Sequence, residues 1–76
     1  MNKQRQHVMH EVIDSLDEAF DVTEEIQDQI SESYDKMPVN FQDTDRGEAM
    51  QKEIDDMDEI MKHITDLKNE VFHLIK

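Results

Sequence analysis

The feature of this sequence that most constrains its fold is an apolar repeat that runs through both halves of the chain and is interrupted once. Steps of three and four residues return to the same face of an α-helix, so a repeat of this kind predicts an amphipathic helix. Over about residues 7–37 the stripe contains Met9, Val12, Leu16, Ala19, Ile26, Ile30 and Met37, with Thr23 and Ser33 filling the gaps and Ile13, Phe20 and Tyr34 widening it on one side.

The only proline and the only glycine, Pro38 and Gly47, mark the interruption. Proline disfavours helical backbone at the residue before it and lacks an amide donor, so we expect a loop over residues 38–44. Thr44 or Asp45 can cap a second helix over about residues 45–75. The stripe of this second helix contains Met50, Ile54, Met57, Ile60, Met61, Ile64, Leu67, Val71, Phe72, Leu74 and Ile75.

Two such helices joined by a short loop form an antiparallel αα-hairpin, which predicts an all-α fold and one domain spanning residues 1–76. Both stripes are wider than one neighbouring helix can cover. The chain is also short and carries a formal net charge of -12, which limits the core that one copy can build. We therefore predict that two hairpins pair into a homodimeric four-helix bundle.

Two apolar residues, Val39 and Phe41, lie inside the predicted loop. Burial would require them to fold back over the end of the bundle, and this is the arrangement that we favour. The alternative is that they stay on the surface as a contact for another molecule.

One sign of charge dominates the first predicted helix. Like charges three or four residues apart destabilise a helix by about 0.2–0.5 kcal/mol per pair. Eight of the carboxylates form two series that each recur every seven residues, and the seven successive pairs among these eight cost about 2–3 kcal/mol at low salt. A solvated surface is the ordinary explanation of charged residues, but this cost and the regular spacing favour a positively charged partner. The ten carboxylates, with no Lys or Arg among them, are Glu11, Asp14, Asp17, Glu18, Asp21, Glu24, Glu25, Asp28, Glu32 and Asp35.

A regular row of carboxylates on a stiff helix is similar to a row of DNA phosphates. Successive carboxylates advance by about 5 Å along the helix, against 3.4 Å for phosphates along one DNA strand. The negative charge argues against direct binding to nucleic acid or to an anionic membrane. We predict a non-enzymatic DNA mimic whose ten carboxylates occupy the DNA-binding surface of a basic protein and inhibit its DNA binding.

Three alternatives remain. The wide apolar stripe also suits a small helical adaptor or regulatory subunit that binds one partner protein. His7, His10 and the pair Glu70 and His73 have spacings seen in metal-binding bundles, but these residues lie near the termini, so we predict no metal or other cofactor. Glu24, Glu25 and Asp28 resemble the Mg²⁺-binding acids of all-α nucleotide pyrophosphohydrolases. Outward-facing acids on two helices form no pocket, however, and we predict no enzyme.

The short helical chain, its acidity, its lack of cysteine and its one-sign face together resemble the small DNA-mimic inhibitors encoded by bacteriophages. They resemble in particular the inhibitors of the bacterial nucleoid protein HU. The resemblance is one of overall character along the whole chain, and it implies a dimer that competes with DNA for a basic host protein. The absence of cysteine and of a signal-peptide pattern predicts a cytoplasmic location, which would be the bacterial host cytoplasm for a phage protein.

Overall fold

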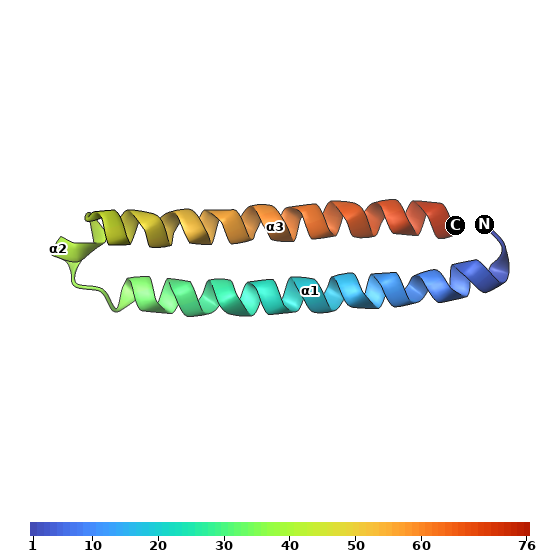
Figure 1. Cartoon of the computed structure of the whole chain (residues 1–76), viewed down its shortest axis with the longest axis horizontal. Helices are drawn as coiled ribbons and strands as arrows, with labels where there is room; N and C mark the ends of the chain where they lie inside the picture. The colour runs from blue at the N-terminus through green and yellow to red at the C-terminus, as the bar shows by residue number, and fades with distance from the viewer.

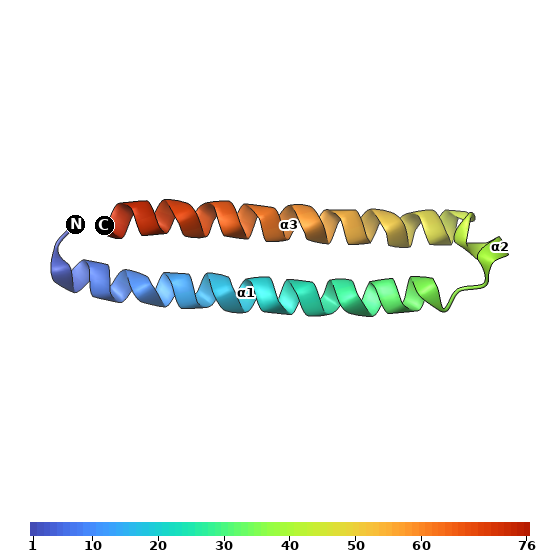
Figure 2. The ribbon, with the colours of Figure 1, turned by 180° about the vertical axis from the view of Figure 1, so that it is seen from behind.

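The computed structural model describes all 76 residues and contains α1 (Lys3–Asp35), α2 (Val39–Gln42) and α3 (Asp45–Ile75). α1 and α3 lie side by side and antiparallel, and α2 forms a single turn at the end where they connect (Figure 1). The resulting rod measures 58 × 15 × 12 Å along its principal axes. Both termini lie at the end opposite α2 (Figure 2). The prediction of an all-α helical hairpin is confirmed.

The first helix begins at Lys3, earlier than the sequence pattern suggested. Asn2 occupies the N-cap position, and its side-chain oxygen accepts a hydrogen bond of 2.8 Å from the backbone amide of Arg5. Such a cap satisfies an amide that has no partner within the helix. The predicted start near His7 followed the first apolar residues, whereas the polar cap extends the helix beyond them.

Gln42 connects the loop to both long helices, through side-chain hydrogen bonds on one side and close backbone packing on the other. Its side-chain amide donates to the carbonyl oxygens of Tyr34 and Met37 at 3.1 and 3.2 Å, where α1 runs out of helical partners. Its backbone packs against the first turn of α3, where a Cβ at Gly47 would lie 2.1 Å from the Gln42 carbonyl oxygen. Only glycine fits at this approach. We call Tyr34, Met37, Gln42 and Gly47 the loop clasp.

Between the two long helices runs a line of buried and half-buried residues, which we call the seam. Only three of its members are buried: Ile13, Met61 and Val71 keep 5, 8 and 6% of their surface exposed. The hairpin alone therefore holds a thin core. The seam comprises Met9, Ile13, Leu16, Phe20, Thr23, Gln27, Ile30, Tyr34 and Met37 on the first side, and Met50, Ile54, Met57, Met61, Ile64, Lys68, Val71 and Ile75 on α3.

The seam corrects the register expected from the sequence. The sequence pattern predicts Val12, Ala19 and Ile26 at the centre of the stripe, but all three are exposed, and α3 covers the neighbouring row that includes Ile13 and Phe20 instead. That row offers larger side chains, and burying more apolar area is more favourable. Gln27 is the one polar member of this row in mid-helix. The cost of burying part of its side chain is offset by the hydrogen bond that its amide donates to the Ile54 carbonyl oxygen at 3.0 Å.

The loop also differs from expectation. Val39 and Phe41 do not fold back over the end of the hairpin: 77% and 53% of their surfaces are exposed. Pro38 starts the single turn of α2, whose backbone hydrogen bonds return to the Pro38 carbonyl oxygen. This turn holds both apolar side chains outward, while the Gln42 side chain points back to the carbonyl oxygens of Tyr34 and Met37.

Neither long helix contains an apolar stretch that would cross a membrane.

Candidate protein-binding surface

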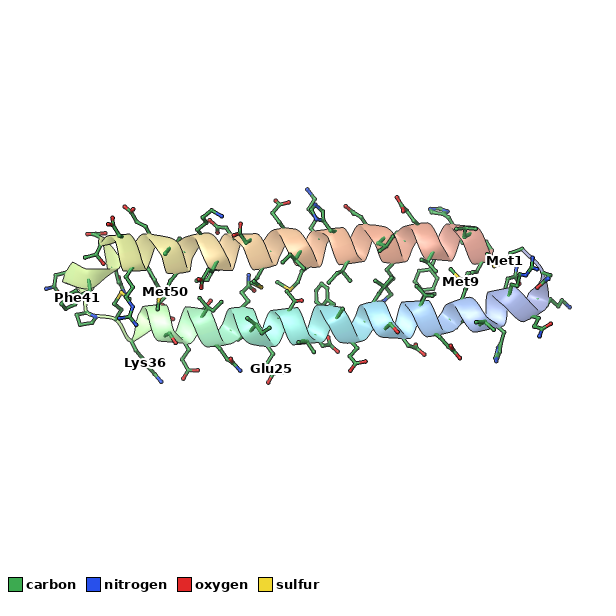
Figure 3. All side chains as sticks on the ribbon, viewed as in Figure 1. Met1, Met9, Glu25, Lys36, Phe41 and Met50 are labelled. Carbon is green, nitrogen blue, oxygen red and sulfur yellow. The ribbon has the colours of Figure 1, made fainter.

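The ten predicted carboxylates all lie exposed on α1, and we call them the acidic ladder. Asp14, Asp21 and Asp28 directly follow seam residues, which turns them about 100° away from α3 onto one broad face of the rod. The glutamates of the ladder at seven-residue spacing lie further round, on the outer edge. Glu25 illustrates this edge, since its side chain points away from α3 (Figure 3).

Most of the ladder has no cation of its own. Within 4.0 Å, only Asp17 and Glu32 meet a basic group, Asp17 through Lys68 of α3 and Glu32 through Lys36 at 3.1 Å. The Glu32 contact joins two side chains that are 68% and 75% exposed, a class of ion pair that contributes little to stability. Eight of the ten carboxylates therefore remain available to charges from outside.

Asp58 of α3 is not part of the acidic ladder, but it lies on the same broad face of the rod as the ladder aspartates. Asp58 of α3 accepts a hydrogen bond of 2.7 Å from the Gln27 side-chain amide, beside the ladder residues Glu24 and Asp28. The acidic character of the first half of α3 was visible in the sequence, but which of its acids face the ladder depends on the seam register. The Gln27 bridge identifies Asp58 as the one joined to α1.

Basic residues lie toward both ends of the acidic ladder. Toward the termini, Lys68 binds Asp17 and its ammonium also lies 5.8 Å from the centre of the Phe72 ring. Toward the loop, Lys36 and Arg46 line an open hollow beside Pro38. Five of the eight unpaired ladder carboxylates lie between Asp17 and Glu32 in the middle of α1, and the other three lie nearer its ends.

The rest of α3 neutralises some of its own acids. Lys52 donates a hydrogen bond of 2.9 Å to Asp56, and this bond raises the pKa of the Lys52 ammonium above its ordinary value. Such a pair within one helix contrasts with α1, where the acids face no lysine over most of the length. The two helices thus differ in how much charge they leave for a partner.

The histidines do not assemble a metal site in the hairpin. No group of three or more His, Asp or Glu side chains comes close enough to hold an ion, including His10 and His73 near the open end. His63 approaches Glu59 at 3.8 Å on the exposed side of α3, as a pair without a third donor. The sequence spacing of these residues does not become a ligand set.

No protein-family model, curated protein or solved structure matches this chain.

Proposed function

We propose that this protein is a non-enzymatic DNA mimic that uses the acidic ladder to occupy the DNA-binding surface of a basic, nucleoid-type protein. The observation that carries the proposal is that eight ladder carboxylates are exposed and have no cation within the chain. Their mutual repulsion costs stability, and a basic partner relieves that cost. The partner would then lose its ability to bind DNA.

The dimensions of the ladder support this proposal. Glu11 and Asp35 are 24 residues apart, which is about 36 Å along a helix axis. One turn of B-DNA spans about 34–36 Å. A protein groove lined with Lys and Arg that follows one turn of duplex therefore meets the ladder over the same length, and releases its bound anions as it would on DNA.

The binding form in this proposal is a homodimer in which two hairpins make a four-helix bundle. The thin core supports it, since only three apolar side chains are buried in one copy. A second hairpin adds apolar burial and holds two ladders on one rigid body. Direct binding to nucleic acid is not part of the proposal because a net charge of -12 repels phosphates.

A gel-shift competition tests the function. Duplex DNA bound to a purified nucleoid-type protein is titrated with this protein at low salt, and free DNA should appear. The double variant Glu18→Lys with Glu25→Lys should need at least about tenfold more protein for half-release, which corresponds to about 1.4 kcal/mol. Added lysines beside Asp14 and Asp21 favour the helix, so the loss would not reflect unfolding.

The chain offers a matched control on the other helix. Glu59 and Asp66 are also seven residues apart on the outer side of α3, and reversing both to lysine changes the net charge by the same amount. The control should release DNA nearly as well as the original protein. Equal loss in both variants would show that only overall charge matters, and undiminished release by the ladder variant would refute the proposal.

A second candidate function is an adaptor that binds one partner protein through apolar contacts. It is favoured by a specific observation, namely exposed apolar residues such as Val22 and Leu67, which are 49% and 47% exposed. Salt separates the two functions. A complex formed by exposed carboxylates should weaken steeply between low and high NaCl, whereas an apolar complex should persist.

A further inference from the structure

Six apolar residues form an exposed row on one broad face of the hairpin. Each of them directly precedes a seam position, and most are substantially exposed: Val12 39%, Ile26 42%, Ile60 42%, Leu67 47% and Leu74 56%. We call the set of six, completed by Ala19, the apolar row.

Helix geometry places all six on the same side. α1 and α3 are both right-handed and run in opposite directions, so a residue just before a seam position turns toward the same broad face in both helices. Residues just after a seam position, such as Asp14 and Asp28, turn toward the other broad face. The apolar row and the aspartates of the acidic ladder therefore lie on opposite faces.

The register of the hairpin brings the row into adjacent pairs. The bonds from Lys68 to Asp17 and from Gln27 to Asp58 join residues whose numbers sum to 85, which sets the level of one helix against the other. Residues with sums near this value lie at the same height. By this rule the row consists of three side-by-side pairs, which are Val12 with Leu74, Ala19 with Leu67, and Ile26 with Ile60.

We infer that a second copy of this chain covers the apolar row, face to face, with the two-fold axis of the dimer parallel to the rod. This inference specifies the surface and symmetry of the proposed homodimer and does not depend on what the acidic ladder binds. It rests on area, on the chemistry of the row and on the distribution of charge.

The area is sufficient for a stable dimer. The row and its flanking residues extend about 30 Å along the rod, and two adjacent helices with side chains present a width of about 20 Å. Pairing two such faces buries about 1,200 Å² in total, at the lower end of stable protein interfaces. The row contains no charged side chain, and the small Ala19 at its centre leaves room for the larger Leu67 of a second copy.

Charge selects the symmetry. α1 holds ten carboxylates against Lys3 and Arg5, a net charge of -8, whereas α3 holds nine against four cations, a net charge of -5. A two-fold axis along the rod stacks α1 on α3 of the second copy, so the two most acidic helices take diagonal corners. An axis across the rod would place α1 directly on α1, where repulsion is greater.

The residues flanking the row agree with this symmetry. Ser15, Val22 and Gln29 lie beside the row on α1, and the same rule of levels places them opposite Glu70, His63 and Asp56 of the second copy. No like charges face each other in these three pairs. Ser15 and Gln29 both carry hydrogen-bond donors that suit a carboxylate.

Sedimentation equilibrium tests the surface. The original protein should have twice the chain mass of 9.1 kDa at micromolar concentration. Ile60→Gln with Leu67→Gln should raise the dissociation constant at least about tenfold. Phe72→Gln is the matched control, since Phe72 is 38% exposed on the opposite broad face, and this variant should stay dimeric. A helical protein with the mass of one chain would overturn the inference, as would dissociation caused by Phe72→Gln and not by the row variant.

Spin labelling tests the symmetry without disturbing the row. The chain has no cysteine, so Asn40→Cys places a single label on the exposed loop. With the axis along the rod, both loops lie at one end and the two labels should be within about 30 Å. An axis across the rod at the level of Ala19 would separate them by about 60 Å. A distance between the labels near the longer value would overturn the proposed symmetry. Gel-shift competition tests the function separately.

Discussion

The two broad faces of the hairpin are both exposed, yet they differ in almost every chemical respect. One presents the apolar row, and the other presents the aspartates of the acidic ladder together with Asp58. Position relative to the seam separates them, since the six residues of the apolar row directly precede seam positions, whereas the aspartates of the ladder and Asp58 directly follow them. A long two-helix rod can thus carry two surfaces for two different kinds of contact.

The comparison also shows that exposure has different meanings on the two faces. Apolar side chains in contiguous exposed patches mark interaction sites, because leaving them in water forgoes the hydrophobic stabilisation. Carboxylates are stable in water, and their cost arises from one another. Contact with another apolar surface, which excludes water, should therefore stabilise the apolar face. Contact with a positively charged surface should stabilise the acidic face.

The largest expected effect tests where one face ends and the seam begins. Ile13→Asp puts an unpaired charge at a site that is 5% exposed, and should abolish the cooperative helical transition followed by circular dichroism. Val12→Asp, one residue away at 39% exposure, should weaken the dimer and lower the melting temperature less. If Val12→Asp destabilised the protein more than Ile13→Asp, Val12 and not Ile13 would face α3, and the register expected from the sequence would be correct.

The next effect concerns the loop clasp, where the Gln42 backbone packs closely against Gly47. Gly47→Ala introduces a Cβ that would lie 2.1 Å from the Gln42 carbonyl oxygen, so the backbone must shift. We expect destabilisation of about 1–3 kcal/mol, typical of overpacking, in a thermal or urea titration. In an ordinary helix the same change is stabilising. A more stable variant would show that α2 does not pack closely on α3.

A smaller and opposite effect is expected on the acidic face. Replacing Glu18, Glu25 and Asp28 by glutamine removes six like-charge pairs of the ladder and should raise stability by about 1–3 kcal/mol at low salt. Release of DNA in the competition assay should become weaker. Added NaCl should raise the melting temperature of the original protein more than that of the variant. A triple variant that is less stable and fully active would leave the ladder without a role in binding.

The smallest effect belongs to the exposed pair of Lys52 and Asp56, which lies outside both faces. The raised pKa of Lys52 means that the pair stabilises the fold below the ordinary lysine pKa of 10.5 and loses this contribution as the pH rises through the raised value. Because both side chains are well exposed, Lys52→Gln should scarcely change the melting temperature at pH 7. A large decrease would indicate that this edge of α3 contacts another chain.

The sequence was sufficient to predict two helices, their antiparallel pairing and the exposure of the ladder, because each depends on local periodicity and on one proline. The seam register was not predictable from periodicity alone. α1 has apolar residues on three adjacent rows, and the choice between Val12 and Ile13 depends on the side chains that α3 brings. The position of Asp58 beside Gln27 follows from the same long-range choice.

The predictions for the loop and for the first turn of α1 were wrong in detail, for local reasons. Asn2 caps the helix through a polar contact that an apolar pattern does not contain. Phe41 was expected to be buried because it is apolar, but the α2 turn directs it outward and uses Gln42 for the contact with α1. In both places a side-chain amide decides the geometry.

The loop lies at one end of the rod and both termini at the other, and this arrangement gives the hairpin an order of closure (Figure 1). Met37 and Met50 near the clasp are 13 residues apart, whereas Ile13 and Val71 near the open end are 58 apart. Because the entropy lost on closing a loop grows with its length, we expect contacts between α1 and α3 to form first beside the loop clasp and then successively toward the termini. Two of the three pairs of the apolar row lie in the half that closes last, so a second copy would complete each hairpin where its own contacts are hardest to form.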